Sequence, residues 1–281
     1  MRWKGREQSG NVEDRRGVSG KTIVAGGTVG TIVILLLVWV LGGNPMDVLQ
    51  NRAQETGIAT EGTNTQASDE LTQFVSVVLK DTEDVWNTLF TESGSTYREP
   101  RLVVFSQATQ SACGYASAAT GPFYCPGDEK VFIDLDFLQQ MQQQLNATGD
   151  FAIAYIIAHE VGHHVQKLLG ITDQMESLRS QFSEAEYNEY SVRLELQADF
   201  LAGVWAYHAQ QTKNILEEGD IEEALNAASS VGDDRMQMQS QGYVVPDAFT
   251  HGSAEQRVRW FTKGFQTGDI NQGDTFHAET L

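Results

Sequence analysis

The sequence has 281 residues, of which 41% are hydrophobic and 20% are charged, values that fit one sizeable globular domain with appendages. Its 38 acidic residues outnumber the 19 basic ones and give a formal net charge of −19. Six of the basic residues lie within residues 1–21, so the remainder of the chain is more acidic still. Because a body of this charge repels phosphate, the composition argues against nucleic acid as a partner.

Residues 22–43 form an apolar run without a single charge. As a helix, this run would rise about 33 Å, which is enough to cross the hydrocarbon core of a membrane. A cleaved secretory signal is the alternative, but the run is longer than a usual signal core and ends in Gly42-Gly43-Asn44-Pro45, a poor cleavage site. We therefore predict an uncleaved, single-pass transmembrane anchor in the cytoplasmic membrane. The basic residues 1–21 would then be a cytoplasmic tail, and the chain from residue 45 onward would be extracytoplasmic.

The rest of the chain divides by composition and apolar spacing. Residues 44–68 lack apolar periodicity and are typical of a linker, residues 69–268 form the predicted domain, and residues 269–281 form a C-terminal tail. In chain order, the domain is expected to hold a helix from Asp69 through Leu89, strands over 101–105 and 130–135, a helix from near Phe151 to Gly170, a helical stretch over 173–211 broken near Ser183, a helix after Asp220 and a helix over 253–265. Few strands followed by many helices predict an α+β domain in which helices dominate and the sheet is small.

The two cysteines, Cys113 and Cys125, lie in a segment that contains Gly, Ser and Pro. Their spacing predicts a disulfide that closes a short loop in an oxidising compartment. Two free buried thiols are the alternative. A zinc site at these residues is disfavoured, since neither a C-x-x-C pattern nor a nearby pair of histidines accompanies them.

Residues 159–163 read His-Glu-Val-Gly-His, which is the pattern H-E-x-x-H. Positions i and i+4 share one face of a helix, so His159 and His163 can bind one Zn²⁺ together. Glu160 lies about 100° further round the helix, and we assign it as the general base that takes a proton from the attacking water. The apolar flanks predict a buried helix, in which two imidazoles need partners such as a metal. A chance match is the alternative.

A catalytic zinc needs a third protein ligand. One class of metallopeptidase places a histidine ten residues after the first, but that position is Leu169. Within residues 191–203, Glu195 and Asp199 lie one helical turn apart. We assign Glu195 as the third ligand and Asp199 as the acceptor of the outward N–H of a ligand histidine. An ordinary solvated face of a helix is the alternative.

These motifs together resemble a known family. The patterns A-H-E-x-G-H-H-x-Q and R-x-E-L-Q-A-D-x-x-A-G-x-W-A, with GPFYCPGD, VFIDLDF and HGSAEQRVRWF, are similar to those of the bacterial neutral zinc metallopeptidases (the YpfJ-like group) over about residues 65–268. The resemblance implies a gluzincin-type zincin fold, Zn²⁺ as cofactor and peptidase activity in a bacterium. It also implies the same roles for His159, His163, Glu195 and Glu160.

Four further features have open interpretations. His251 lies in a segment similar to one of membrane-associated gluzincins, and it either donates a hydrogen bond to the developing oxyanion or simply precedes the helix that Ser253 caps. Arg257 pairs either with a site carboxylate or with surface acids. His164 is expected beside the site or on the surface. The strand over 130–135 is expected to be the edge along which an extended peptide aligns, or to have a structural role only.

The predicted function is hydrolysis of peptide bonds within protein or peptide substrates, outside the cytoplasmic membrane. The alternative is a zinc-binding, membrane-anchored structural or chaperone-like protein with little turnover, and the presence of Glu160 argues against it because a structural metal needs only its ligands. Proteolysis within the membrane is disfavoured because the apolar run of Phe151–Ala158 is too short to span a bilayer. The expected partners are a peptide or protein substrate and, through the anchor, the membrane.

Overall fold

The computed structural model of the chain describes residues 1–16, 64–117, 120–138 and 149–281. One compact unit comprises residues 1–14 and 71–281, and a second comprises residues 15–70. The predicted anchor over 22–43 and most of the predicted linker lie outside the described residues. Within the described ranges, no helix combines the length and the apolarity that crossing a membrane requires.

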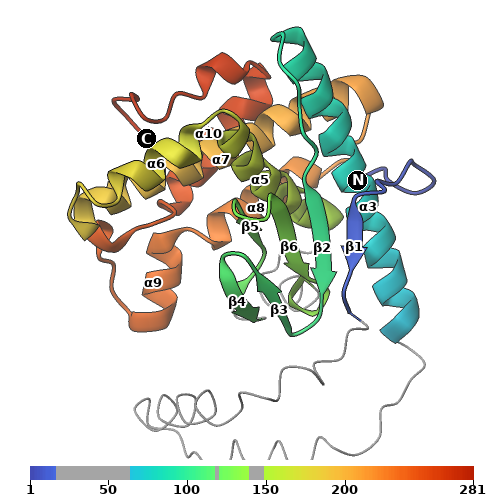
Figure 1. Ribbon diagram of the computed structural model, residues 1–281, viewed down its shortest axis with the longest axis horizontal. Helices are drawn as coiled ribbons and strands as arrows, with labels where there is room; N and C mark the ends of the chain where they lie inside the picture. Colours follow the sequence, from blue (N-terminus) through green and yellow to red (C-terminus); the bar gives the residue numbers. More distant parts are fainter. Residues whose placement is uncertain (17–63, 118–119, 139–148) are drawn as a thin grey trace, which may run out of the picture. The chain divides into compact units, whose positions relative to one another are not determined.

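A four-stranded sheet forms one side of the larger unit (Figure 1). The strands lie in the order β1 (Val12–Asp14), β2 (Arg101–Phe105), β6 (Lys130–Asp134) and β5 (Phe123–Cys125). The first three run parallel, whereas β5 pairs antiparallel with β6. A separate antiparallel hairpin joins β3 (Ala108–Ser111) to β4 (Gly114–Ser117).

The two predicted strands, β2 and β6, are confirmed, but the predicted role of β6 as the peptide-binding edge is wrong. Phe123 pairs with Phe132 and Cys125 with Lys130, so β5 covers the side of β6 that faces away from β2. The edge of the sheet on that side is therefore β5.

Residues 1–14 belong to the larger unit rather than to a tail that ends at residue 21. The ring of Trp3 packs edge-on against Phe74 with centroids 5.4 Å apart, Arg6 pairs with the buried Asp81, and β1 pairs in register with β2. These contacts give the apolar and charged side chains of the segment partners that an isolated tail would lack. Strands that pair must lie in the same compartment, so residues 1–14 and the body cannot be separated by a membrane.

The helices provide most of the larger unit, as expected. Their bounds are α3 (Asn64–Glu92), α5 (Asp150–Leu168), α6 (Ile171–Leu178), α7 (Glu184–Lys213), α8 (Asp220–Ser230), α9 (Asp233–Gln241) and α10 (Ala254–Thr267), with short 3₁₀ turns η3 (Pro246–Ala248) and η4 (Ile270–Gln272). The predicted break before α7 is confirmed: Ser183 caps α7 and forms a reciprocal capping box with Glu186. Gly170 ends α5 in the left-handed conformation, with φ of 79°. The helix-dominated α+β class is confirmed.

Helix α5 lies at the centre of the unit, in contact with β5 and β6 as well as with α7 and α8 (Figure 1). Its apolar side chains from Phe151 to Val165 are buried, except for Ile156, which is half-buried. Helices α7 and α10 pack very closely at Gly203 and Gly264, where an added Cβ would lie only 2.1 Å from Phe261 O and 2.0 Å from Phe200 O. The residues predicted as a C-terminal tail also pack on α7, since Gln197 donates to Gly273 O and Thr275 to Arg193 O.

Candidate metal centre

Helices α5 and α7 bring the three predicted ligands together. Nε2 of His159 lies 3.1 Å from Oε2 of Glu195, and Nε2 of His163 lies 3.5 Å from Oε1 of the same carboxylate. In a tetrahedral zinc site with bonds of 2.0–2.1 Å, neighbouring donor atoms lie about 3.3–3.4 Å apart. The side chains of His159, His163 and Glu195 therefore fit Zn²⁺ in both chemistry and spacing.

A close approach of the two helices makes this convergence possible. Gly162, the fourth residue of the H-E-x-x-H pattern, faces Ala198 on α7, and a Cβ at Gly162 would lie 3.0 Å from Ala198 O. A larger residue there would move apart the helices that carry the imidazoles and the carboxylate. The motif position is glycine for a packing reason.

Asp199 holds His159 as expected, and the structure adds two partners that share the same carboxylate. Oδ1 of Asp199 lies 2.8 Å from Nδ1 of His159 and accepts from the Tyr155 hydroxyl at 2.5 Å. Arg257 donates to both oxygens, at 2.8 and 2.9 Å. The interpretation of Arg257 as the partner of a site carboxylate is therefore confirmed, and a role on the surface is excluded by its burial.

The sequence did not reveal how His163 is held. Nδ1 of His163 lies 2.9 Å from Oε1 of Gln166, and Nε2 of Gln166 donates to Leu194 O and to Oε1 of Gln197. The amide oxygen can only accept, so Nδ1 of His163 carries the proton and Nε2 is left as the metal donor. The one available signal is that Gln166 follows His163 by three residues, on the same side of α5.

The charges of the pocket favour a bound cation. Burial lowers the pKa of His159, but Asp199 and Glu195 outweigh it and raise the pKa to about 10. Burial also opposes ionisation of Glu195, yet the two imidazoles hold its pKa well below the ordinary value. The pKa of the buried Asp199 falls to about 2 beside Arg257 and His159. Without a metal, the carboxylates therefore favour protonation of the imidazoles. A bound dication would supply positive charge in place of those protons.

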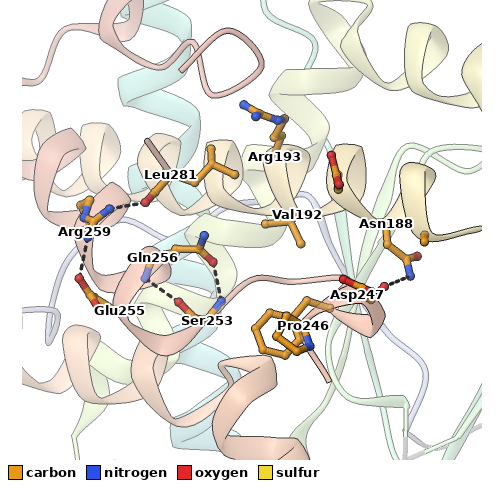
Figure 2. A pocket seen from close by; sticks show the side chains of 13 residues that line it. Asn188, Val192, Arg193, Pro246, Asp247, Ser253, Glu255, Gln256, Arg259 and Leu281 are labelled. Atoms are coloured by element: carbon orange, nitrogen blue, oxygen red, sulfur yellow. Dashed lines mark hydrogen bonds and ion pairs between the residues drawn. The ribbon is translucent and has the colours of Figure 1, made fainter. Parts of the chain in front are cut away.

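The three ligands line a cavity of about 460 Å³, together with Glu160, His251 and the segment Thr120–Tyr124 that leads into and includes most of β5. A second cavity, of about 580 Å³, lies between α7 and the start of α10 (Figure 2). Two of its charged side chains, Arg259 and Glu255, pair with each other, Arg193 donates to backbone carbonyl oxygens, and no histidine lines the cavity among the described residues. The described residues hold one other cluster with metal-ligand spacing, Asp150, Asp220 and Glu223, but it offers carboxylates alone and contacts the amino group of Met1.

Comparison with known proteins agrees with this donor set. Residues 1–276 match the family model described as "Putative neutral zinc metallopeptidase". The chain belongs to this family. The protein YpfJ of Escherichia coli K12 is 47% identical over 98% of the chain and 99% of its own length. A protein of Mycobacterium tuberculosis, Rv2575, is 40% identical over 86% of the chain and 83% of its own length. No solved structure matches the chain significantly. The family name implies zinc as the metal, and the family resemblance found in the sequence is confirmed.

His251 lies on the wall of the cavity that His159, His163 and Glu195 also line. The carboxylate of Asp233 lies 3.3 Å from its Nδ1 and accepts from the backbone N–H groups of Thr250, His251 and Gly252. Ser253 also caps α10, so the two interpretations of this segment are compatible in space. Asp233 was not recognised from the sequence, because it lies 18 residues before the histidine it holds.

His164 is not on the surface. It is fully buried behind the ligand face of α5, between Tyr97 and Tyr124. The predicted disulfide between Cys113 and Cys125 is formed, with Cα atoms 5.8 Å apart, and it ties the β3–β4 hairpin to the end of β5.

Proposed function

We propose that the protein is a zinc-dependent endopeptidase. The observation that carries the proposal is the convergence of His159, His163 and Glu195 at a cavity wall that also bears Glu160. In the described part of the chain this group has three members and no fourth, which is the pattern of a catalytic rather than a structural zinc site. Glu160 is not needed as a ligand and is therefore available for proton transfer.

The residues of the cavity divide the chemistry among them. Zinc, when bound, acts as a Lewis acid towards the scissile carbonyl and favours deprotonation of the attacking water. Glu160 accepts the proton of that water and returns it to the leaving amine. His251 donates a hydrogen bond to the developing oxyanion, and Asp233 holds its ring. Asp199 and Gln166 keep the two imidazoles in the tautomer that metal binding requires.

The edge strand β5 offers a place for the substrate backbone. It is the last strand of the described sheet, where it pairs only with β6, and Phe123 and Tyr124 line the cavity. An extended peptide that pairs with this edge would lay its carbonyl groups along the ligand helix.

The cavity lining favours cleavage inside a chain rather than at its end. Apart from the metal-site residues Glu160, Glu195, the imidazoles and Arg257, the described side chains of the lining are uncharged. The guanidinium of Arg257 is held by both oxygens of Asp199, so it is not free to bind a terminal carboxylate. We propose substrates that are longer peptides or unfolded segments of proteins.

We further propose that the body works outside the bacterial cytoplasmic membrane. A disulfide between Cys113 and Cys125 is typical of an oxidising compartment and supports this location. Because β1 pairs with β2, residues 1–14 would lie on the same side as the body, and this pairing is not compatible with a single crossing of the membrane by residues 22–43.

The test uses the full chain purified in detergent, loaded with zinc and incubated with an unfolded protein such as reduced casein. The wild type is expected to hold one zinc ion per chain and to cleave, and Glu160→Gln is expected to keep the zinc while losing at least about 100-fold in rate. Equal cleavage by both proteins would remove Glu160 from the mechanism. Zinc binding without any cleavage by the wild type would favour a structural or chaperone-like role.

A further inference from the structure

Both ring nitrogens of the buried His164 are engaged. Nε2 lies 2.6 Å from the carbonyl oxygen of Arg98, and Nδ1 lies 3.0 Å from the hydroxyl of Tyr124. A carbonyl can only accept, so Nε2 carries the proton, and Nδ1 accepts from the tyrosine hydroxyl. His164 is therefore neutral in this arrangement, and it joins α5 to the segment before β2 and to the edge strand β5.

Tyr124 lies at the middle of β5, a strand of only three residues. The strand is held by backbone pairing with β6 and, at its end, by the disulfide of Cys125 with Cys113. Neither of these holds connects β5 to the helix that carries the metal ligands. The hydrogen bond from Tyr124 to His164 does.

The place of His164 along α5 gives this bond a consequence for the site. His164 follows Glu160 by four residues, so the two side chains share one face of the helix. Tyr124 lines the same cavity as Glu160, while its hydroxyl points to His164. The separation between β5 and the face that carries Glu160 is thus fixed through the pair Tyr124–His164.

We propose that His164 is a positioning residue that sets the distance between the substrate-aligning strand β5 and Glu160. This inference rests on the proposed peptidase function. It assigns no ligand role to His164, whose nitrogens are both occupied by protein partners. A peptide pairs fully with β5 only while this bond holds the strand at the cavity wall, so loss of the bond weakens binding of the peptide.

The test compares Tyr124→Phe with wild type in the zinc-loaded full chain. Tyr124→Phe removes one hydroxyl and keeps the ring, and it is expected to raise KM for a ten-residue peptide roughly three- to tenfold with little change in kcat. Zinc content stays at the wild-type value. His164→Phe should give the same split, and combining it with Tyr124→Phe should add little, because both changes break one bond. His164→Asn keeps an acceptor for the Tyr124 hydroxyl, so its KM should lie between those of His164→Phe and wild type.

Tyr115→Phe is the matched control, because Tyr115 is exposed on β4 and is not among the residues that line the cavity. A fall in kcat alone, an unchanged KM in Tyr124→Phe, or fully additive effects in the double variant would overturn the proposal. Amide hydrogen exchange separates this failure from a failure of the peptidase function, since it needs no turnover. Even in a protein that cleaves nothing, Tyr124→Phe should speed exchange at residues 123–125 and leave α5 protected. Unchanged exchange at residues 123–125 overturns the inference.

Discussion

Oδ1 of Asp199 lies 2.8 Å from Nδ1 of His159, and Arg257 donates one hydrogen bond to each oxygen of the same carboxylate. All three side chains are buried. A charged carboxylate accepts a hydrogen bond from Nδ1–H of His159 and leaves Nε2 as the atom that can bind the metal. The charge of Arg257 offsets that of Asp199, so the burial of this carboxylate does not depend on the metal.

Asp199→Asn is expected to weaken zinc binding about 10- to 100-fold, because the amide removes the charge that supports His159 and leaves Arg257 buried without its counter-ion. Competition with a coloured zinc chelator measures the affinity. Asp247→Asn, a change on the exposed turn η3, serves as control. Affinity equal to wild type in Asp199→Asn would show that His159 is held by other contacts.

Glu195→Ala tests the ligand set itself. Removing one of three protein ligands should reduce zinc in the purified protein to well below one ion per chain, as measured by elemental analysis. Glu189→Ala changes a carboxylate on the same helix that lines the second cavity, and it should keep the full zinc content. Full occupancy in Glu195→Ala would point to a different third ligand.

The convergence of His159, His163 and Glu195 was predictable from one sequence because a helix repeats every 3.6 residues. His159 and His163 share a face by spacing alone, and Glu195 and Asp199 repeat the same relation on α7. Gln166 was not predictable in this way, since an amide in a helix carries no sign of what it contacts. Asp233 was missed because its partner His251 comes from a loop far along the chain.

The same contrast applies to the fold. The long periodic helices and the apolar runs of β2 and β6 were recognised, as each carries its pattern within itself. Strands β1 and β5 have three residues each, too few for any alternation to appear, and they form because the edges of β2 and β6 pair with them. The position of β6 inside the sheet, and hence the identity of the edge strand, depends on that long-range pairing.

The pH dependence of activity should report the pair His251–Asp233. The hydrogen bond with Asp233 raises the pKa of His251; burial and Arg257 lower it, and Glu195 raises it. If the charged ring donates to the oxyanion, kcat falls as pH rises through this raised pKa. Asp233→Asn keeps an acceptor for the loop amides but lowers the pKa of His251, so the alkaline limb of the kcat profile should move to lower pH. A limb that does not move would separate His251 from the rate.

The contact of α7 with α10 makes a prediction about stability. Gly203→Ala would place a methyl group 2.1 Å from Phe261 O, so the helices must separate, at a cost of about 2–4 kcal/mol. Urea denaturation of the full chain, followed by circular dichroism, measures the loss. Gly10→Ala is the control, because nothing lies within 4 Å of its added Cβ and its φ is not positive. Equal midpoints for both variants would mean that the two helices pack more loosely than described.

The pairing of β1 with β2 predicts that residues 1–14 and the body lie on the same side of the membrane. Whether that side is outside the cytoplasm is a separate question, and one labelling experiment answers both. Gln8 lies exposed in the segment that leads to β1, and Glu255 lies exposed on α10. Because the native cysteines are joined, Gln8→Cys and Glu255→Cys each introduce a single reactive thiol. A maleimide that cannot cross membranes, applied to intact spheroplasts, should label both variants. Labelling of Glu255→Cys alone would contradict the pairing of β1 with β2. If neither variant is labelled until the cells are lysed, the result is consistent with the pairing of β1 with β2 but places the body in the cytoplasm. The same experiment can therefore overturn the external location without contradicting the fold.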